Sequence, residues 1–338
     1  MIASRENTMR FIDAETIEAH LSYPALIDTL AEAFRLGAIA PPRHHHAVPL
    51  SGRPEATWLL MPAISALPTD AVQGASPGAG AYMGIKSVTV FGENVARPGK
   101  PAVFGTYLLL STETGETIAV LDATRLTLWR TAAASALAAS YLARAGSSRL
   151  VMVGAGALAP YLIRAHASVR PIREVAVWNR TPANAQRVAD AVSVALPSLS
   201  VTITSDLEQA CRHADIISAA TMSREPLIRG AWLSPGTHVD CVGAYNKDMR
   251  ETDDELVSSA SVFCDTYAGT FGEAGDILQV LATGRIGREH VRAELADLIA
   301  RRHGGRSSDG EITLFKSVGA SIEDLAAAIA VYESVLKN

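Results

Sequence analysis

The chain of 338 residues is poor in cysteine, aromatic residues and charge. Its three cysteines, Cys211, Cys241 and Cys264, are widely spaced and form no Cys-x-x-Cys pair, which argues against a disulfide framework or a thiolate metal site. Aromatic residues account for 6% and charged residues for 19%, against 48% hydrophobic residues, so the composition excludes a disordered or coiled-coil chain. We therefore expect a folded protein in which the cysteines are small buried side chains.

Long apolar runs and an excess of positive charge are also missing. No eighteen consecutive apolar residues occur, and the N-terminal segment has no apolar core of a signal peptide, which predicts a cytoplasmic protein without a membrane span. The 30 Lys and Arg residues face 35 Asp and Glu residues, for a net charge of −5. Phosphate binding depends on clustered cations, so we expect no nucleic-acid partner.

The length predicts two domains, and the pattern of apolar residues changes along the chain. Residues 13–37 have the spacing of a helix that ends at Gly37, and residues 124–145 form an Ala- and Leu-rich stretch long enough for a six-turn helix. Between them lie short runs typical of the strands of one sheet: 55–62, 81–91, 103–110 and 117–121.

After residue 146, short apolar runs alternate strictly with helical patterns. Such alternation is typical of βαβ units on a parallel sheet. The fold class is therefore α/β, with a Rossmann-type, doubly wound dinucleotide-binding domain. The predicted strands are RLVMV, EVAVW, SVTIT, DIISAA, THVDCV and SVFCD, and near the end of the chain EITLFKSVG reads as a strand and turn before a helix at 321–336.

A glycine-rich turn follows the first of these strands. In Gly154-Ala155-Gly156-Ala157-Leu158-Ala159, the first glycine permits a tight turn, the second lets a pyrophosphate approach the backbone, and Ala159 allows the helix to pack closely on the strand. The alternative is that the glycines only make a turn, and the strand before them and the alternation after them favour the cofactor. We assign Gly154, Gly156, Ala157 and Leu158 to cofactor binding.

The end of the second strand bears on the choice of cofactor. A site for NAD places a carboxylate there to bind the ribose 2′-hydroxyl, whereas a site for NADP supplies Arg for the 2′-phosphate. Here the strand ends in Asn179-Arg180-Thr181, without a carboxylate. We predict NADPH, with NADH as a weaker substitute. The alternative is that Arg180 is simply solvated.

Three cations of the first part of the chain are candidates for holding an anion: Arg43 in PPRHHH, Lys86 in the apolar run YMGIKSVTV and Arg130 in the Ala-rich LWRTAAAS. A charged group inside an apolar strand needs a counter-charge or a lined cavity, so Lys86 indicates a pocket for a carboxylate. Each of the three is alternatively an ordinary surface cation. The run His44-His45-His46 alternates between two faces if extended and has no nearby ligands to complete a tetrahedral set, so we predict no metal.

With these motifs in place, the chain resembles the ornithine cyclodeaminase/mu-crystallin family over almost its whole length. The motifs that carry the resemblance are PPRH (41–44), LLMPA (59–63), GIKSV (84–88), LWRTAAASALAA (128–139), VGAGALA (153–159), CVGAY (241–245) and LFKSVG (314–319). The resemblance implies a homodimer. It also implies that residues 1–128 and 313–338 form a substrate-binding and dimerisation domain into which a Rossmann domain, 129–312, is inserted.

The resemblance also implies the roles of the site residues. Arg43, Lys86 and Arg130 would hold the substrate carboxylate, with Lys86 and Arg130 the candidate catalytic residues and Lys86 the candidate proton donor. The nicotinamide half of the cofactor would be lined by Thr131, Thr221, Val242, Gly243 and Ser317.

Members of the family differ in chemistry. Cyclodeaminases of the family carry a Glu and an Asp where this chain has Leu59 and Tyr245, so we expect a reductase of cyclic ketimines, acting on Δ1-pyrroline-2-carboxylate or Δ1-piperideine-2-carboxylate to give L-proline or L-pipecolate. A preformed imine needs a carboxylate clamp, a proton and a hydride donor. The alternatives are an ornithine cyclodeaminase, an alanine dehydrogenase-like enzyme and a non-catalytic mu-crystallin-like protein that binds NADPH.

Overall fold

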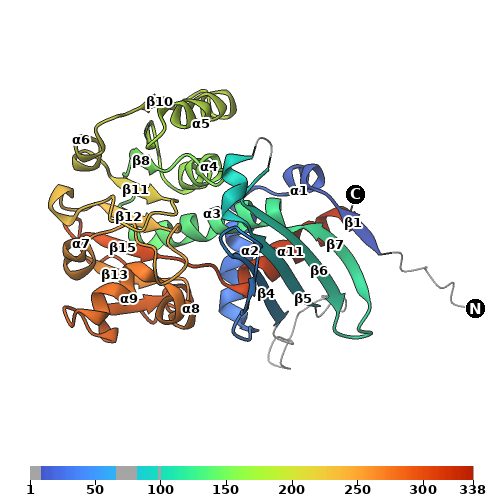
Figure 1. Cartoon of the computed structure of the whole chain (residues 1–338). Helices are drawn as coiled ribbons and strands as arrows, with labels where there is room; N and C mark the ends of the chain where they lie inside the picture. Colours follow the sequence, from blue (N-terminus) through green and yellow to red (C-terminus); the bar gives the residue numbers. More distant parts are fainter. Residues whose placement is uncertain (1–8, 66–81, 98–99, 338) are drawn as a thin grey trace, which may run out of the picture. The chain divides into compact units, whose positions relative to one another are not determined.

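The computed structural model describes residues 9–65, 82–97 and 100–337. The chain divides into two compact units (Figure 1), one made of residues 1–130 and 321–338 and the other of residues 131–320. The chain therefore returns to the first unit later than the predicted boundary at residue 313. The reason is that the strand Thr313–Lys316 pairs within the sheet of the second unit.

The first unit is built on a mixed sheet of seven strands. Its strand order is β1-β7-β6-β5-β4-β2, with β3 paired to β4, and all neighbours are antiparallel except β1 and β7. Its elements are β1 (Arg10–Ile12), α1 (Ala14–His20), α2 (Tyr23–Leu36), β2 (Ala38–Ile39), β3 (His44–Val48), β4 (Ala56–Ser65), β5 (Tyr82–Val90), the 3-10 helix Gly92–Ala96, β6 (Val103–Ser111), β7 (Thr117–Asp122), the first residues of α3 (Ala123–Leu142) and α11 (Ser321–Lys337).

The predicted helix over residues 13–37 is wrong, because two helices occupy this stretch. Ser22 is extended and caps α2, and Pro24 stands in the first turn of α2. Proline has no N–H to donate to the preceding turn and disfavours helical backbone before it, so α1 cannot continue. Gly37 ends α2 with a φ of +82°, as the sequence predicted.

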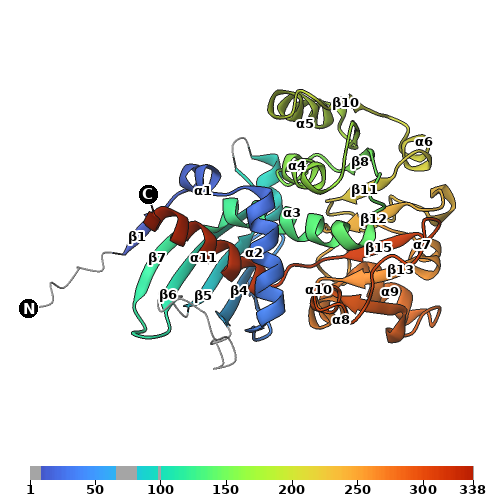
Figure 2. The ribbon, with the colours of Figure 1, turned by 180° about the vertical axis from the view of Figure 1, so that it is seen from behind.

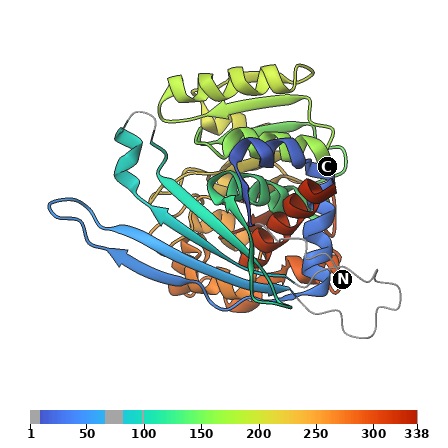
Figure 3. The ribbon, with the colours of Figure 1, turned by 90° about the vertical axis from the view of Figure 1, so that its right-hand side faces the viewer.

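One face of this sheet is buried, because α11 packs against β4, β5 and β6 with α2 beside it (Figure 2). Side chains alternate along a strand, so Leu59, Met61 and Ala63 of β4 are buried, while the neighbours between them are half exposed on the other face. β3 pairs with β4 at the border of the sheet, and the turn that joins the two strands projects from it (Figure 3).

The second unit holds a sheet of eight parallel strands in the order β10-β9-β8-β11-β12-β15-β13-β14. Its elements after α3 are β8 (Arg149–Val153), α4 (Ala159–Val169), β9 (Glu174–Trp178), α5 (Pro182–Ala195), β10 (Ser200–Ile203), α6 (Leu207–Arg212), β11 (Ile216–Ala219), the 3-10 helix Gly230–Trp232, β12 (His238–Cys241), α7 (Asp254–Ser259), β13 (Ser261–Cys264), α8 (Tyr267–Glu273), α9 (Gly275–Ala282), the 3-10 helix Arg288–His290, β14 (Val291–Glu294), α10 (Leu295–Ile299) and β15 (Thr313–Lys316). The strand order reverses between β8 and β11, which is where a doubly wound sheet binds its ligand.

Helices cover both faces of this parallel sheet, as the predicted α/β fold requires. Apolar residues of α6, α7 and α9 join one core cluster with the strands. On the opposite face, His166 of α4 contacts the buried Asp240 of β12 through Nε2 and Oδ2, 3.1 Å apart. The three cysteines are buried and free. Within the described ranges, no helix has the length and apolar character that crossing a bilayer requires.

Candidate active site

Lys86 lies in the middle of the buried face of the first unit. The strand register places Met61 of β4, Lys86 of β5 and Tyr107 of β6 side by side in one row, and all three are almost fully buried. Only 2% of the Lys86 side chain is exposed. A buried ammonium needs a counter-charge, and α11 supplies it.

Two carboxylates at the start of α11 pair with the predicted cations. Lys86 Nζ lies 2.7 Å from Asp324 Oδ2, and Arg130 donates from Nε to Asp324 Oδ1 over 2.9 Å. Arg130 Nη1 also lies 2.7 Å from Glu323 Oε2. Both carboxylates are fully buried, so α11 is tied to the sheet and to α3 by a dense ion-pair cluster.

Glu323 and Asp324 are members of this cluster that the sequence analysis left without a role. Their signal was present, because two adjacent acids precede a run of apolar residues in the same helix. Acids on a buried helix face need cationic partners, and Lys86 and Arg130 are buried cations that need acids.

A third predicted cation lies near the cluster. Arg43 is half buried just before β3, and its charge lowers the pKa of Lys86, which places it within electrostatic reach of the cluster. Arg43 and Arg130 therefore both act on the ammonium group of Lys86.

The pKa of Lys86 is lowered to about 8, first by burial and then by the charge of Arg130. Asp324 acts in the opposite direction by favouring the ammonium form. An ammonium with this pKa is mostly protonated at neutral pH and gives up its proton more readily than an exposed lysine.

Tyr107 adds a hydroxyl group that the sequence analysis did not single out. The side chain is fully buried next to Lys86, and a side chain at Gly84 would collide with its ring. Its hydroxyl has no hydrogen-bond partner within the described part of the chain. Burial and the charge of Asp324 raise its pKa well above the ordinary value, so it carries its proton at neutral pH.

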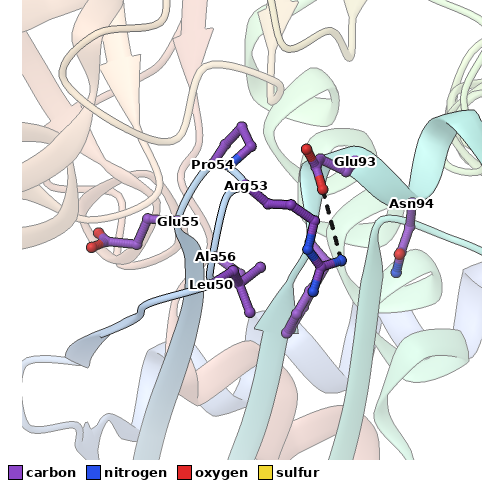
Figure 4. A pocket seen from close by; sticks show the side chains of 9 residues that line it. Leu50, Arg53, Pro54, Glu55, Ala56, Glu93 and Asn94 are labelled. Carbon is purple, nitrogen blue, oxygen red and sulfur yellow. Dashed lines mark ion pairs between the residues drawn. The ribbon is translucent and has the colours of Figure 1, made fainter.

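His44 and His46 of β3 are exposed, with ring centroids 6.3 Å apart. Among the residues with described positions, no three His, Cys, Asp or Glu side chains are grouped as a metal site. A cavity of about 270 Å³ lies elsewhere in the first unit, beside the ion pair of Arg53 and Glu93 (Figure 4), and no predicted site residue lines it.

In the second unit, the backbone of the glycine turn fits a dinucleotide. Gly154 has a φ of +102°, and a Cβ there would lie 2.7 Å from the carbonyl oxygen of Ala220, so only glycine fits. A Cβ at Gly156 would meet nothing within 4 Å, so this glycine leaves open space rather than serving packing. No side chain caps the following helix α4 at Leu158, so the positive end of its dipole faces the glycine turn without a protein carboxylate on it.

Asn179 joins the glycine turn to the end of β9. Its Oδ1 accepts a hydrogen bond from the N–H of Ala155 over 3.2 Å, and its Nδ2 donates to the carbonyl oxygen of Thr181 over 3.0 Å. Arg180 is exposed between them, and Thr181 caps the start of α5 without a side-chain hydrogen bond. The residues therefore suit an adenosine ribose, with Arg180 available for a phosphate on it.

The predicted nicotinamide residues Thr221, Val242, Gly243 and Ser317 follow β11, β12 and β15, which are neighbours in the sheet. The carboxyl ends of neighbouring parallel strands share one edge, so the structure brings these four residues to the edge that carries Gly154. Thr131 stands apart from them in sequence, in α3 directly after Arg130.

Two buried carboxylates that the sequence analysis missed organise this edge. Glu251 accepts hydrogen bonds from Thr221 and Gly243. Asp265 accepts from the Ser317 hydroxyl over 3.1 Å and from the N–H groups of Val318 and Gly319. Both carboxylates accept hydrogen bonds from loops that are distant in sequence, so no local sequence pattern predicts their role.

Comparisons with known proteins agree with this architecture. The family model described as ornithine cyclodeaminase/mu-crystallin family matches residues 8–338. The Δ1-pyrroline-2-carboxylate reductase of Paracoccus denitrificans is 43% identical over 246 residues, which cover 72% of this chain and 77% of that protein.

Two solved structures share the fold. That of Thermococcus litoralis Δ1-pyrroline-2-carboxylate reductase in complex with NADH and L-proline has a TM-score of 0.90 and 32% identity, covering 97% of this chain and 98% of the other. An archaeal alanine dehydrogenase dimer with bound NAD has a TM-score of 0.85 and 31% identity, covering 97% and 96%. With its motifs in the same order and the family model matched almost from end to end, this chain belongs to the ornithine cyclodeaminase/mu-crystallin family.

Proposed function

We propose that this protein reduces the cyclic ketimines Δ1-pyrroline-2-carboxylate and Δ1-piperideine-2-carboxylate with NADPH, giving L-proline and L-pipecolate. The coarser class follows from its relatives: the protein is an imine-reducing oxidoreductase that uses a nicotinamide cofactor. The observation that carries the finer proposal is the buried ion-pair cluster, which holds Lys86 and Arg130 in place with Arg43 within electrostatic reach, a set of cations that suits a substrate carboxylate.

Two residues, one in each unit, support reduction rather than cyclodeamination. Leu59, where the cyclodeaminases of the family carry a Glu, is buried on the same face of β4 as Met61. Tyr245 stands where they carry an Asp, and burial raises the pKa of its phenol. Neither residue is a base for a substrate amine, whereas a preformed imine needs none.

The chain's own residues then have distinct tasks. Arg43 and Arg130 hold the substrate carboxylate, because a guanidinium binds a carboxylate through two parallel hydrogen bonds. Lys86 donates a proton to the imine nitrogen and regains one from water, while Asp324 holds the ammonium in place. A nicotinamide cofactor, when bound, would supply the hydride for the carbon of the double bond. With the proton on nitrogen and the hydride on carbon, the C=N bond becomes a C–N single bond with one new N–H and one new C–H bond.

An assay of NADPH oxidation across four substrate conditions tests the function. We expect turnover with pyrroline-2-carboxylate and piperideine-2-carboxylate, and little with pyruvate plus ammonia or with ornithine. Ammonia release from ornithine without net NADPH consumption would identify a cyclodeaminase instead. Preferred turnover of pyruvate with ammonia would identify an alanine dehydrogenase-like enzyme, and tight NADPH binding without any turnover would identify a binding protein.

The preference for NADPH rests on Arg180. We expect Arg180→Ser to raise the KM for NADPH by roughly 10- to 100-fold, the equivalent of one lost charge-assisted contact, and to leave the KM for NADH nearly unchanged. The control is Arg173→Ser, which removes an exposed arginine next to the opposite end of β9. Equal effects of Arg180→Ser on both cofactors would contradict the assignment.

The role of Lys86 predicts a pH dependence. Because the pKa of Lys86 is about 8, the proton-bearing form is lost above that pH, and we expect kcat/KM for ketimine reduction to fall there. Lys86→Arg keeps the positive charge but does not titrate in this range, so its lower activity should show no such decline. If the decline is the same in both proteins, it belongs to the substrate and Lys86 is not the proton donor.

We also propose a homodimer that forms through the open face of the first sheet, in the cytoplasm. Support comes from Trp58 and Phe104, large apolar side chains that are 40% and 42% exposed. We expect light scattering to show a dimer that Phe104→Glu dissociates. The matched control is Ile203→Glu in β10, where the side chain is 44% exposed. A single-chain mass for the unmodified protein would contradict the proposal.

A further inference from the structure

The carboxylate of Glu251 connects two loops of the second unit. Its Oε1 accepts hydrogen bonds from the N–H and the hydroxyl of Thr221, over 2.7 and 2.9 Å. Its Oε2 accepts from the N–H groups of Gly243 and Ala244, over 2.9 and 3.3 Å. Thr221 follows β11 and Gly243 follows β12, so one side chain sets the spacing of the loops after two neighbouring strands.

The two loops also pack closely against each other and against the Glu251 carboxylate. A Cβ at Gly243 would collide with the backbone of Thr221 and with Oε1 of Glu251. The backbone N–H groups that donate hydrogen bonds to Glu251 follow the last paired residues of β11 and β12 in the chain, so strand pairing does not hold them. The carboxylate therefore links the two loops by hydrogen bonds, just as backbone hydrogen bonds link the two strands.

Glu251 is itself held by two more buried charges. The N–H groups of Glu251 and Thr252 donate to Asp276 Oδ1, over 2.7 and 2.9 Å. Asp276 Oδ2 lies 3.1 Å from Nζ of Lys316, the last residue of β15. All three charged side chains are fully buried, so the chain of contacts runs from the ends of β11 and β12 to the end of β15.

These strand ends carry the residues that the proposed function places around the nicotinamide. We propose that Glu251 is a positioning residue for the nicotinamide end of the cofactor site, holding Thr221 and Gly243 at the spacing that the ring requires. This inference rests on the proposed function, because only that function assigns these residues to the nicotinamide. The adenine end is built by other residues, the glycine turn and Asn179 to Thr181, and none of the four hydrogen bonds that the Glu251 side chain accepts comes from them.

The separation of the two ends gives a local test. Glu251→Gln replaces two acceptor oxygens by one oxygen and an NH2 group that faces N–H donors, so one loop must move away. We expect its Kd for NADPH, followed by NADPH fluorescence, to rise at least tenfold. Its Kd for adenosine 2′,5′-bisphosphate, a probe of the adenine end measured by calorimetry, should stay within about twofold. The control is Glu255→Gln, which removes an exposed acid of α7.

A second variant covers the case in which Glu251→Gln does not fold. Glu251→Asp keeps the charge but shortens the side chain, so it cannot reach both loops, and we expect the same selective loss of NADPH affinity to a smaller extent. Unchanged NADPH binding in the folded variants, or an equal loss for NADPH and the adenine-end probe, would overturn the inference. Failure of the unmodified protein to bind NADPH would instead contradict the proposed cofactor, which keeps the two failures distinct.

Discussion

The first unit depends on the pairing of buried charges between α11 and the sheet. Arg130 is the last residue before the chain enters the second unit, and Asp324 lies just after its return, yet their side chains are in direct contact. Removing one member of such a cluster would leave an uncompensated buried charge, which costs far more than a surface ion pair contributes. The cluster thus specifies where the C-terminal helix docks after a long excursion of the chain.

The same cluster links the fold to the proposed chemistry. Ion pairs with Glu323 and Asp324 fix the positions of Lys86 and Arg130. The proposed substrate carboxylate would therefore meet side chains that are already oriented, which lowers the cost of ordering the site when it binds.

The second unit applies the same principle to backbone groups. Parallel strands satisfy their own N–H groups, but the loops that leave their carboxyl ends do not. Glu251 and Asp265 accept hydrogen bonds from these loops, whereas the N–H groups at the start of α4 have no such side-chain cap. Protein carboxylates therefore occupy one part of this edge, and the positive end of α4 remains for the phosphates of a cofactor.

Local signals were sufficient for much of the fold. Each predicted strand from RLVMV onward is present. The central strands β8, β11, β12, β13 and β15 are buried on both faces, and such strands read as short apolar runs. The spacing of apolar residues misled where two consecutive helices have the same spacing. Apolar residues recur at helical intervals throughout residues 13–37, although the helix is interrupted at Ser22, and Pro24 is the local sign of that interruption.

The residue at which the chain re-enters the first unit could not be predicted for a different reason. EITLFKSVG is recognisable as a strand, but its sheet partners β12 and β13 are distant in sequence, and no local pattern shows which strands pair. By itself, the amino-acid sequence determined the glycine turn, the arginine that follows β9 and the presence of cations in apolar surroundings, since these depend on residue type and near neighbours. Only the tertiary structure decided that Asp324 faces Lys86 and that Glu251 joins two loops, because a buried charge finds its partner in space and not along the chain.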